Sequence, residues 1–254
     1  MLITILSYGT GAVFILLTFP VALLLRVLTF PFDRHRLLVG WSLVWLGRLF
    51  IRTSPLWEVT VEGTLPAPPS TYVVVPNHQS LVDALAVACL PANLKWIGKR
   101  SAFQLPWLGW AFSLAGYVPV LRGEKADGRR ALARLRRYLA EGVPVGLFAE
   151  GTRSRDGQLK DFKAGPFKLA IEAGVPVIPV AISGAGAAMP ADQAWIRPSR
   201  ITVRILEPIP TRGMSVDDVE PLRAAVRQRL LEAVEASSSS GRPDRGEAGE
   251  GPMA

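Results

Sequence analysis

A histidine and an aspartate, His78 and Asp83, stand five positions apart directly after the apolar run 72–76. An imidazole at the end of a strand can take a proton from a hydroxyl group near neutral pH, and a nearby carboxylate can fix its tautomer and stabilise the cation that forms. Five residues of regular helix turn by about 500°, so the two side chains would not share a helix face. We therefore expect His78 in a strand-to-helix loop, with Asp83 in the first helical turn and bent back toward the ring.

The same residues also have a purely structural interpretation. Ser80 and Asp83 satisfy the Ser-x-x-acid pattern that caps the start of a helix, here before the apolar segment 84–90. On that interpretation Asp83 is a helix cap and nothing more. The two interpretations are compatible, because Ser80 can cap the helix backbone while the Asp83 carboxylate faces the ring.

A second polar segment, 148–154, follows the strand-like run 143–147 and combines a glycine, a hydroxyl group and arginine. Gly151 allows the backbone to approach a ligand closely, Thr152 can donate a hydrogen bond, and Arg153 presents a planar fork of donors that matches phosphate oxygens. These residue types in this order indicate a phosphate site. A surface turn with a solvated ion pair is the alternative, since such pairs are common.

Glu150 fits a phosphate site less directly than its neighbours. Its carboxylate could orient Arg153 or Arg122, or it could accept a hydrogen bond from a hydroxyl group of the ligand. The sequence leaves these roles open.

Together these segments resemble the glycerolipid acyltransferases, specifically the bacterial 1-acylglycerol-3-phosphate acyltransferases. The resemblance starts with His78 and Asp83 and continues, about seventy residues later, with Glu150 to Arg153. Segments similar to other blocks of the family stand in the family's order at 98–100, 106–110, 116–122 and 175–182. The matching blocks thus extend from about residue 77 to residue 182.

The resemblance implies an α/β fold, in which a mixed sheet is flanked by helices and preceded by an N-terminal two-helix membrane-associating motif. It implies transfer of an acyl chain from an acyl thioester to the sn-2 hydroxyl of lysophosphatidic acid, which gives phosphatidic acid in phospholipid biosynthesis. The catalytic residues would be His78, as general base, and Asp83, as its orienting partner. The substrate-binding residues would be Arg122, Glu150, Gly151, Thr152 and Arg153.

Two positions depart from the family pattern. Ala149 stands where a proline is usual before the glutamate, and Leu121 stands where an aspartate commonly precedes the arginine. Loss of the proline is expected to loosen the phosphate-binding loop. Leu121, together with Pro119, is expected to change the local geometry around Arg122.

The expected co-substrate is acyl-coenzyme A or acyl carrier protein, which present the same thioester, and no cofactor or metal is expected. The chain has two histidines and one cysteine, Cys89, without clustered ligands, so a zinc site is not indicated.

Three other functions stay open. The closest is an acyltransferase for another lyso-lipid acceptor. A serine hydrolase would use Ser80 or Ser154, although neither stands in a Gly-x-Ser-x-Gly motif, and a non-catalytic membrane adaptor would use no nucleophile.

The first 25 residues carry no charged side chain. This segment is long enough to cross a bilayer core, which needs about 20 apolar residues. Gly9, Gly11 and Pro20 interrupt this run, and a basic hinge separates it from a second apolar stretch at 37–51. A secretory signal is disfavoured, because the apolar run has no basic segment before it and no small-residue cleavage site after it. A single span, a hairpin in one leaflet and a pair of buried helices stay open. The resemblance favours membrane attachment, and the basic hinge favours the cytoplasmic face of the inner membrane.

The formal net charge is +8 and the sequence pI is about 10.1. Basic residues beside long apolar segments favour anionic lipid head groups and an anionic substrate over nucleic acid. The sequence has no zinc-finger, RNA-recognition or Gly-Lys-Ser signature, so no nucleic-acid partner is expected. The expected partners are lysophosphatidic acid, the acyl donor and membrane lipids.

Strand-like and helical runs alternate after the N-terminal segment, which is typical of α/β proteins. Strands are expected at 57–61, 72–75, 143–148, 177–182 and 201–206, and helices at 81–90, 126–140, 166–173 and 216–236. We expect N-terminal membrane-associating helices at 1–52 and an α/β acyltransferase domain at 53–236. The tail at 237–254 is rich in Ser, Gly and charge and is expected to be disordered.

Overall fold

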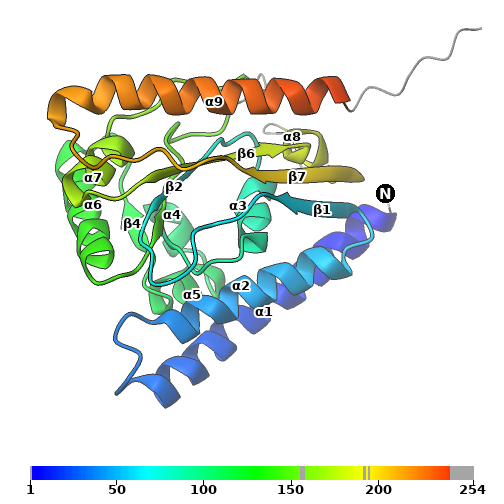
Figure 1. The fold of residues 1–254 in the computed structure, drawn as a ribbon. Coiled ribbons are helices and arrows are strands. Elements are labelled where there is room, and N and C mark those ends of the chain that lie inside the picture. Colours follow the sequence, from blue (N-terminus) through cyan, green and yellow to red (C-terminus); the bar gives the residue numbers. More distant parts are fainter. Residues whose placement is uncertain (1, 155–157, 191–192, 194, 241–254) are drawn as a thin grey trace, which may run out of the picture.

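The computed structural model describes residues 2–154, 158–190, 193 and 195–240. Its centre is a seven-stranded sheet with the order β1-β7-β6-β2-β5-β3-β4 (Figure 1). Neighbouring strands are parallel, except that β6 and β7 are antiparallel, which confirms the mixed sheet. The strands are β1 Trp57–Glu62, β2 Val73–Pro76, β3 Lys95–Lys99, β4 Val118–Val120, β5 Val145–Gly146, β6 Val177–Ser183 and β7 Ser199–Ile205.

Helices cover both faces of the sheet. The longer ones are α1 Leu2–Thr29, α2 Leu37–Thr53, α6 Lys125–Ala140, α7 Gly165–Ala173 and α9 Val219–Ser240. The shorter ones are α3 Val82–Ala86, η1 Val87–Cys89, α4 Arg100–Phe103, α5 Leu108–Leu114, α8 Ala185–Ala188 and η2 Val216–Asp218. Figure 1 shows α9 on one side of the sheet and α1, α2 and α5 on the other.

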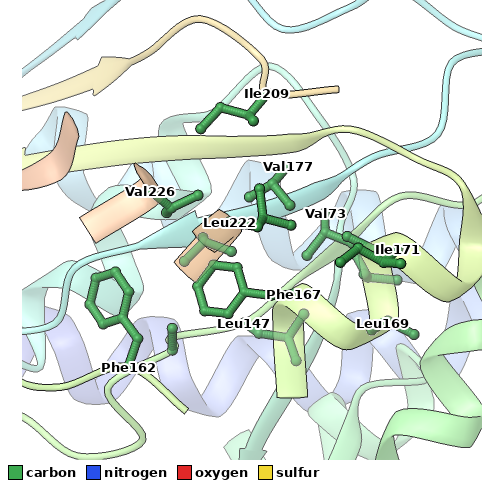
Figure 2. Close-up of a cluster of buried hydrophobic side chains, with 14 of the residues drawn as sticks. Val73, Leu147, Phe162, Phe167, Leu169, Ile171, Val177, Ile209, Leu222 and Val226 are labelled. Carbon is green, nitrogen blue, oxygen red and sulfur yellow. The ribbon is translucent and has the colours of Figure 1, made fainter. Parts of the chain in front are cut away.

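The central strand β2 is buried on both faces, so its successive valines enter two different cores. Val73 and Val75 pack with side chains of α6, α7 and α9, including the rings and branched chains that surround Phe167 in Figure 2. Val74 points the other way and packs with α3 and with β1, β6 and β7. Burial of β2 from both sides fixes the position of the loop that follows it.

Helix α6 follows its expected pattern. Ala131, Leu135 and Leu139 recur every four residues and are buried against the sheet, while the arginines between them face solvent. The expected helix at 81–90 is divided into α3 and the 3-10 helix η1, because the chain turns before Leu90. Helix α9 continues to Ser240, so 237–240 of the expected tail are helical, and 241–254 lie outside the described residues.

Two strands were not expected from the sequence. Strand β3 starts and ends with lysine, and its first lysine, Lys95, is fully buried. Strand β4 has three residues, with Pro119 at its centre, and lies at the edge of the sheet, where a missing N–H is tolerated. The expected strand at 143–148 pairs only over β5, Val145–Gly146. Charge, proline and short length hid these strands from a search for alternating apolar residues.

The N-terminal helices α1 and α2 form an antiparallel pair beside the α/β domain (Figure 1). Helix α1 is continuous through Gly9, Gly11 and Pro20. Its segment Ser7–Thr29 has a mean hydropathy of 2.3 and is 11% buried, so by length and composition it could cross a membrane. Ala22, in the C-terminal third of α1, is fully buried in a small cluster with residues of α2 and α5.

Lys95 connects the hinge between these helices to the α/β domain. Its Nζ donates hydrogen bonds to the carbonyls of Arg36, at 3.0 Å, and Ala115, at 2.7 Å. The Arg36 guanidinium donates in turn to the carbonyl of Ser113, at 2.8 Å. Burial lowers the pKa of Lys95 to about 7, which the nearby Asp33 carboxylate opposes. The two-helix unit is thus fastened to β3 and α5 by polar contacts as well as by apolar packing.

Candidate active site

The two polar motifs meet because β2 and β5 are parallel neighbours. His78 follows the carboxyl end of β2, and Glu150 follows the carboxyl end of β5. The carboxyl ends of adjacent parallel strands lie at one edge of a sheet, where open α/β folds bind ligands. The backbone N–H of Ser154 donates to the His78 carbonyl, at 2.9 Å, which joins the loops after these strands directly. The structure therefore brings together motifs that are about seventy residues apart in the sequence.

Asp83 bends back toward the imidazole, as the sequence interpretation required. Its Oδ2 lies 3.0 Å from His78 Nδ1 and also accepts hydrogen bonds from the N–H groups of Gln79, at 2.6 Å, and Ser80, at 2.7 Å. A carboxylate can only accept, so Nδ1 carries the proton and Nε2 has the free lone pair. Asp83 is fully buried, and the His78 side chain is 12% exposed. Among the described residues Nε2 has no hydrogen-bond partner, and the pair holds this nitrogen in a fixed position.

Ser80 contributes to the loop in a different way from the expected cap. Helix α3 begins at Val82, and the Ser80 Oγ accepts from the Val82 N–H at 3.2 Å while donating to the Met189 carbonyl at 2.7 Å. Asp83 supplies the reciprocal half of the capping pattern through its bond from the Ser80 N–H. With the same oxygen, Asp83 thus holds the loop before α3 and orients the histidine.

Two side chains that the sequence analysis did not select hold the His78 loop in place. Phe148 stacks on the imidazole, with ring centroids 4.2 Å apart and planes inclined by 29°. Asn77 is fully buried, and its amide donates to the Ile182 carbonyl at 2.9 Å and accepts from the Ile182 N–H at 2.7 Å. Asn77 therefore anchors the end of β2 to β6, and Phe148 restricts rotation of the ring.

Glu150 binds backbone rather than arginine. Its Oε1 accepts from the His78 N–H at 2.7 Å and its Oε2 from the Lys160 N–H at 3.2 Å, and the side chain is buried. Burial raises the pKa of Glu150 to about 7, and the neighbouring Asp83 carboxylate adds to the increase, while the two N–H donors oppose it. Among the three roles that the sequence left open, neither arginine contact is present. The carboxylate instead joins the two motifs.

At Gly151, in the loop after Glu150, a larger residue would displace the side chain of Lys163. Gly151 has φ +70°, and a Cβ on it would lie 2.6 Å from Lys163 Cε and 2.9 Å from Lys163 Nζ. Thr152 is exposed, and Arg153 is half-buried, with its carbonyl accepting from Lys160 Nζ at 2.9 Å. The glycine lets the loop backbone and the Lys163 ammonium come close together, which adds a cation that the sequence motif did not include.

Arg122 and Arg153 come from different loops and lie within electrostatic range of each other. Partial burial and the Arg153 charge lower the pKa of Arg122 below its usual range. Across residues 2–154, 158–190, 193 and 195–240, the structure gives neither guanidinium a hydrogen-bond or ion-pair partner. Two neighbouring cations without a counter-charge favour binding of an anion.

The two positions that depart from the family pattern each make a backbone hydrogen bond in the structure. The Ala149 carbonyl accepts from the Lys163 N–H at 2.9 Å, and this bond helps to hold the loop where a proline is usual. The Leu121 N–H donates to Asp127 Oδ2 at 2.6 Å, and Asp127 is also bound by Arg100 at 3.0 Å. Asp127, at the start of α6, thus fixes the turn that carries Arg122.

This fold and this edge define an α/β protein whose chemistry would be proton removal beside a bound anion. The model of a family described as acyltransferase matches residues 58–183, a range that contains both motifs. The chain belongs to the acyltransferase family.

Similar proteins carry a more specific name. A 1-acyl-sn-glycerol-3-phosphate acyltransferase from Chlamydomonas reinhardtii is 35% identical over 195 residues, which are 76% of this chain and 59% of that protein. A chloroplastic enzyme of the same name from Arabidopsis thaliana is 36% identical over 64% of this chain and 46% of its own length. The chain thus spans about half the length of these two relatives. The crystal structure of a 1-acyl-sn-glycerophosphate acyltransferase from Thermotoga maritima matches with a TM-score of 0.79 and 29% identity, over 96% of this chain and 97% of that one.

Proposed function

We propose that this protein is a 1-acylglycerol-3-phosphate O-acyltransferase. It transfers an acyl chain from an acyl thioester to the sn-2 hydroxyl of lysophosphatidic acid and so forms phosphatidic acid in phospholipid biosynthesis. One observation carries the proposal: a His78–Asp83 pair, at 3.0 Å, shares a sheet edge with Arg122 and Arg153, whose guanidinium groups have no partner among the described residues. An acceptor with both a phosphate and a free hydroxyl group fits this combination. The names of the relatives agree with it.

The phosphate of the acceptor would bind between the loops after β4 and β5. Arg153 and Arg122 supply guanidinium donors, and Lys163 supplies an ammonium group beside the Gly151 backbone. Thr152 adds an exposed hydroxyl group. Binding the phosphate there holds the rest of a small acceptor over the His78 ring, because Glu150 and Ser154 tie this loop to the His78 backbone.

His78 would then act as general base. Its Nε2 removes the proton of the sn-2 hydroxyl as the hydroxyl oxygen attacks the thioester carbonyl carbon, and Asp83 stabilises the imidazolium. The tetrahedral intermediate collapses with cleavage of the carbon–sulfur bond, and the thiolate takes the proton from His78. The balance is one new oxygen ester and one free thiol. No cofactor is needed, and acyl-coenzyme A and acyl carrier protein both supply the thioester.

A serine nucleophile is less consistent with this geometry. Ser80 is fully buried, and its hydroxyl donates to the Met189 carbonyl rather than to the histidine. The Nδ1 atom of His78 is occupied by Asp83, so only Nε2 could activate a nucleophile. Direct transfer to the acceptor therefore requires fewer changes to the site than an acyl-enzyme.

We also propose that α1 and α2 attach the protein to the cytoplasmic face of the inner membrane. From residue 7 onward, where side chains are described, α1 and the hinge expose these large apolar side chains: Tyr8, Val13, Ile15, Leu16, Leu17, Leu23, Leu24, Val27, Leu28, Phe30 and Phe32. The C-terminal third of α1, at Ala22, packs on α5 of the α/β domain. This contact favours a helix that lies in the interfacial plane over one that crosses the bilayer, because a crossing helix would take α5 to the bilayer centre.

The proposed reaction is tested with detergent-purified protein, lysophosphatidic acid and either acyl-coenzyme A or acyl carrier protein thioester, followed by mass spectrometry of phosphatidic acid. Wild-type protein and His35→Ala, which replaces the other histidine of the chain, should form product, whereas His78→Ala should not. The donor that gives product is thereby identified. Equal product from wild type and His78→Ala would refute the general base, and no product from folded wild type with either donor would refute the acceptor.

A further inference from the structure

The turn between α4 and α5 exposes three large apolar side chains within six residues. Leu105 is 51% exposed, Trp107 is 37% exposed and Trp110 is 45% exposed. Single exposed apolar residues are normal, but grouped ones mark a binding surface. We refer to 105–110 as the tryptophan turn.

Backbone strain at the centre of this turn shows that its shape is imposed. Trp107 has φ +65° and ψ −68°, and the Leu108 N–H donates to the Pro106 carbonyl at 2.7 Å, which closes a γ-turn of the rare, strained kind. The backbone at Gly109 packs closely against α4, because a Cβ there would lie 2.5 Å from the Ala102 and Phe103 carbonyl oxygens. Strain of this kind concentrates at functional sites. Here the strained residue, Trp107, is one of the two that present an indole to solvent.

The tryptophan turn is continuous with the apolar face of α1. The Phe19 ring lies edge-on to both indoles, with centroids 5.7 Å from Trp107 and 5.2 Å from Trp110, and the two indoles are 6.1 Å apart. Figure 1 shows α5 beside α1 and α2, on the side of the sheet away from α9. The turn and the exposed side chains of α1 therefore face one environment.

The chemistry of the turn fits the interface of an anionic bilayer. Indoles prefer the boundary between lipid chains and head groups, where the ring is apolar and the N–H can donate. Among the described residues, neither Trp107 nor Trp110 donates its indole N–H to a protein acceptor. The exposed Lys99 stands directly before α4. Arg34, in the hinge that is held to α5 through Arg36, is 82% exposed at its side chain and pairs with Glu141 at 3.4 Å. Such cations attract anionic head groups.

We propose that the tryptophan turn is a third membrane-contacting element, supplied by the α/β domain itself, and that its indoles enter the head-group region of an anionic bilayer together with α1. This inference rests on the proposed membrane attachment of α1. Contact through the turn would set the depth and tilt of the α/β domain, and with them the height of the His78 edge above the lipid. A protein partner seated on the turn is the competing occupant.

The test uses full-length protein in which Cys89→Ala removes the one cysteine of the chain. Single cysteines are then introduced by Leu105→Cys in the tryptophan turn, Val27→Cys on the exposed face of α1, or Val216→Cys. Val216 is exposed and begins η2, which leads directly into α9, the helix on the opposite side of the sheet (Figure 1). Each variant carries a nitrobenzoxadiazole label and is mixed with phosphatidylglycerol–phosphatidylcholine vesicles, with and without nitroxide-labelled lipid.

Labels at positions 105 and 27 should shift to shorter emission wavelength and be quenched by nitroxide lipid, and the label at 216 should do neither. A label at 105 that behaves like the one at 216, while the one at 27 responds, would overturn the inference and favour a protein partner. If the label at 27 also fails to respond, the proposed attachment of α1 is itself wrong, and the inference falls with it.

A second measurement compares the vesicle partitioning of variants that lack one of the two tryptophan side chains. Trp110→Ser should lower vesicle partitioning by roughly tenfold, from the loss of one large apolar group, and Trp107→Gly, which suits the positive φ, should do the same. Val216→Ser is the matched control and should have no effect. Activity on a short-chain, monomeric lysophosphatidic acid should stay at the wild-type level in all three. Unchanged partitioning of both tryptophan variants would overturn the inference.

Discussion

The two halves of the proposed site are held in opposite ways. In the acid–base half, Asp83 is fully buried and one of its oxygens receives three hydrogen bonds. In the cationic half, Arg122 and Arg153 come from separate loops, and the described part of the chain gives their guanidinium groups no partner. A base must keep one tautomer and one direction, so it is fixed before the substrate arrives, whereas cations that recognise an anion must keep their donors free.

Glu150 lies between the halves and belongs to neither. Its carboxylate binds the backbone of His78 on one side and of Lys160 on the other. The cationic loop is therefore attached to the base through a buried carboxylate and the Ser154–His78 bond. Substitutions in each half should fail in different ways, and those at the junction should affect both.

The largest effect is expected in the acid–base half. His78→Ala and Asp83→Asn should each lower kcat by about 10²–10⁴-fold with little change in KM, because general-base catalysis contributes about that much. The double variant should be no worse than the more damaging single one, since the residues act as a unit. Steady-state kinetics on a soluble acceptor measures this. Multiplicative losses would mean that Asp83 acts independently of His78.

The next effect should appear in KM rather than kcat. Arg153→Ala should raise KM for lysophosphatidic acid by about tenfold to a hundredfold, because a charge-assisted hydrogen bond is worth about 1.5–3 kcal/mol. Arg200→Ala, on β7 and 91% exposed at its side chain, is the control and should be silent. If Arg153→Ala lowered kcat alone, Arg153 would belong to the acid–base half, and the division of the site into two halves would be wrong.

A smaller loss is expected from Gly151→Ala. Both Gly151 and Gly174 have positive φ, at +70° and +64°, so alanine should cost about 1–2 kcal/mol of folding stability at either position. Only at Gly151 would the new Cβ also displace Lys163. We expect similar thermal destabilisation from Gly151→Ala and Gly174→Ala, but about a tenfold loss of acceptor affinity in the first alone. Equal affinities would remove Lys163 from the phosphate site.

The smallest effect is a change in pH dependence. The pKa of Glu150 is about 7 in the folded state, raised from 4.5. Between these two pH values the folded protein keeps the Glu150 proton, whereas the unfolded protein has lost it. The contribution of Glu150 to the free energy of unfolding therefore falls as pH rises through this window. Glu150→Gln should flatten the decline in denaturant titrations between pH 5 and 8. Parallel curves for both proteins would show that Glu150 titrates normally.

Local patterns were sufficient for much of this protein. His78 and Asp83 are close in the chain, so helix geometry predicted that His78 precedes the helix and that the Asp83 carboxylate can bend back to it, as the structure shows. The four-residue spacing of Ala131, Leu135 and Leu139 likewise predicted the buried stripe of α6. Strand β6 was expected within one residue of its observed bounds, because its apolar run is uninterrupted. The α/β fold and the family were expected from these motifs, and the comparisons confirm both.

The sequence by itself determined the chemistry of the two motifs and the elements that carry them, because side-chain type and local periodicity act over a few residues. Only the tertiary structure decided which groups each motif would meet. Asn77 binds Ile182, Glu150 binds the His78 backbone, and Lys163 lies against Gly151. Each of these contacts depends on which strands are neighbours in the sheet and how the loops after them fold back. That order is set by burial of the whole core, which no short segment specifies.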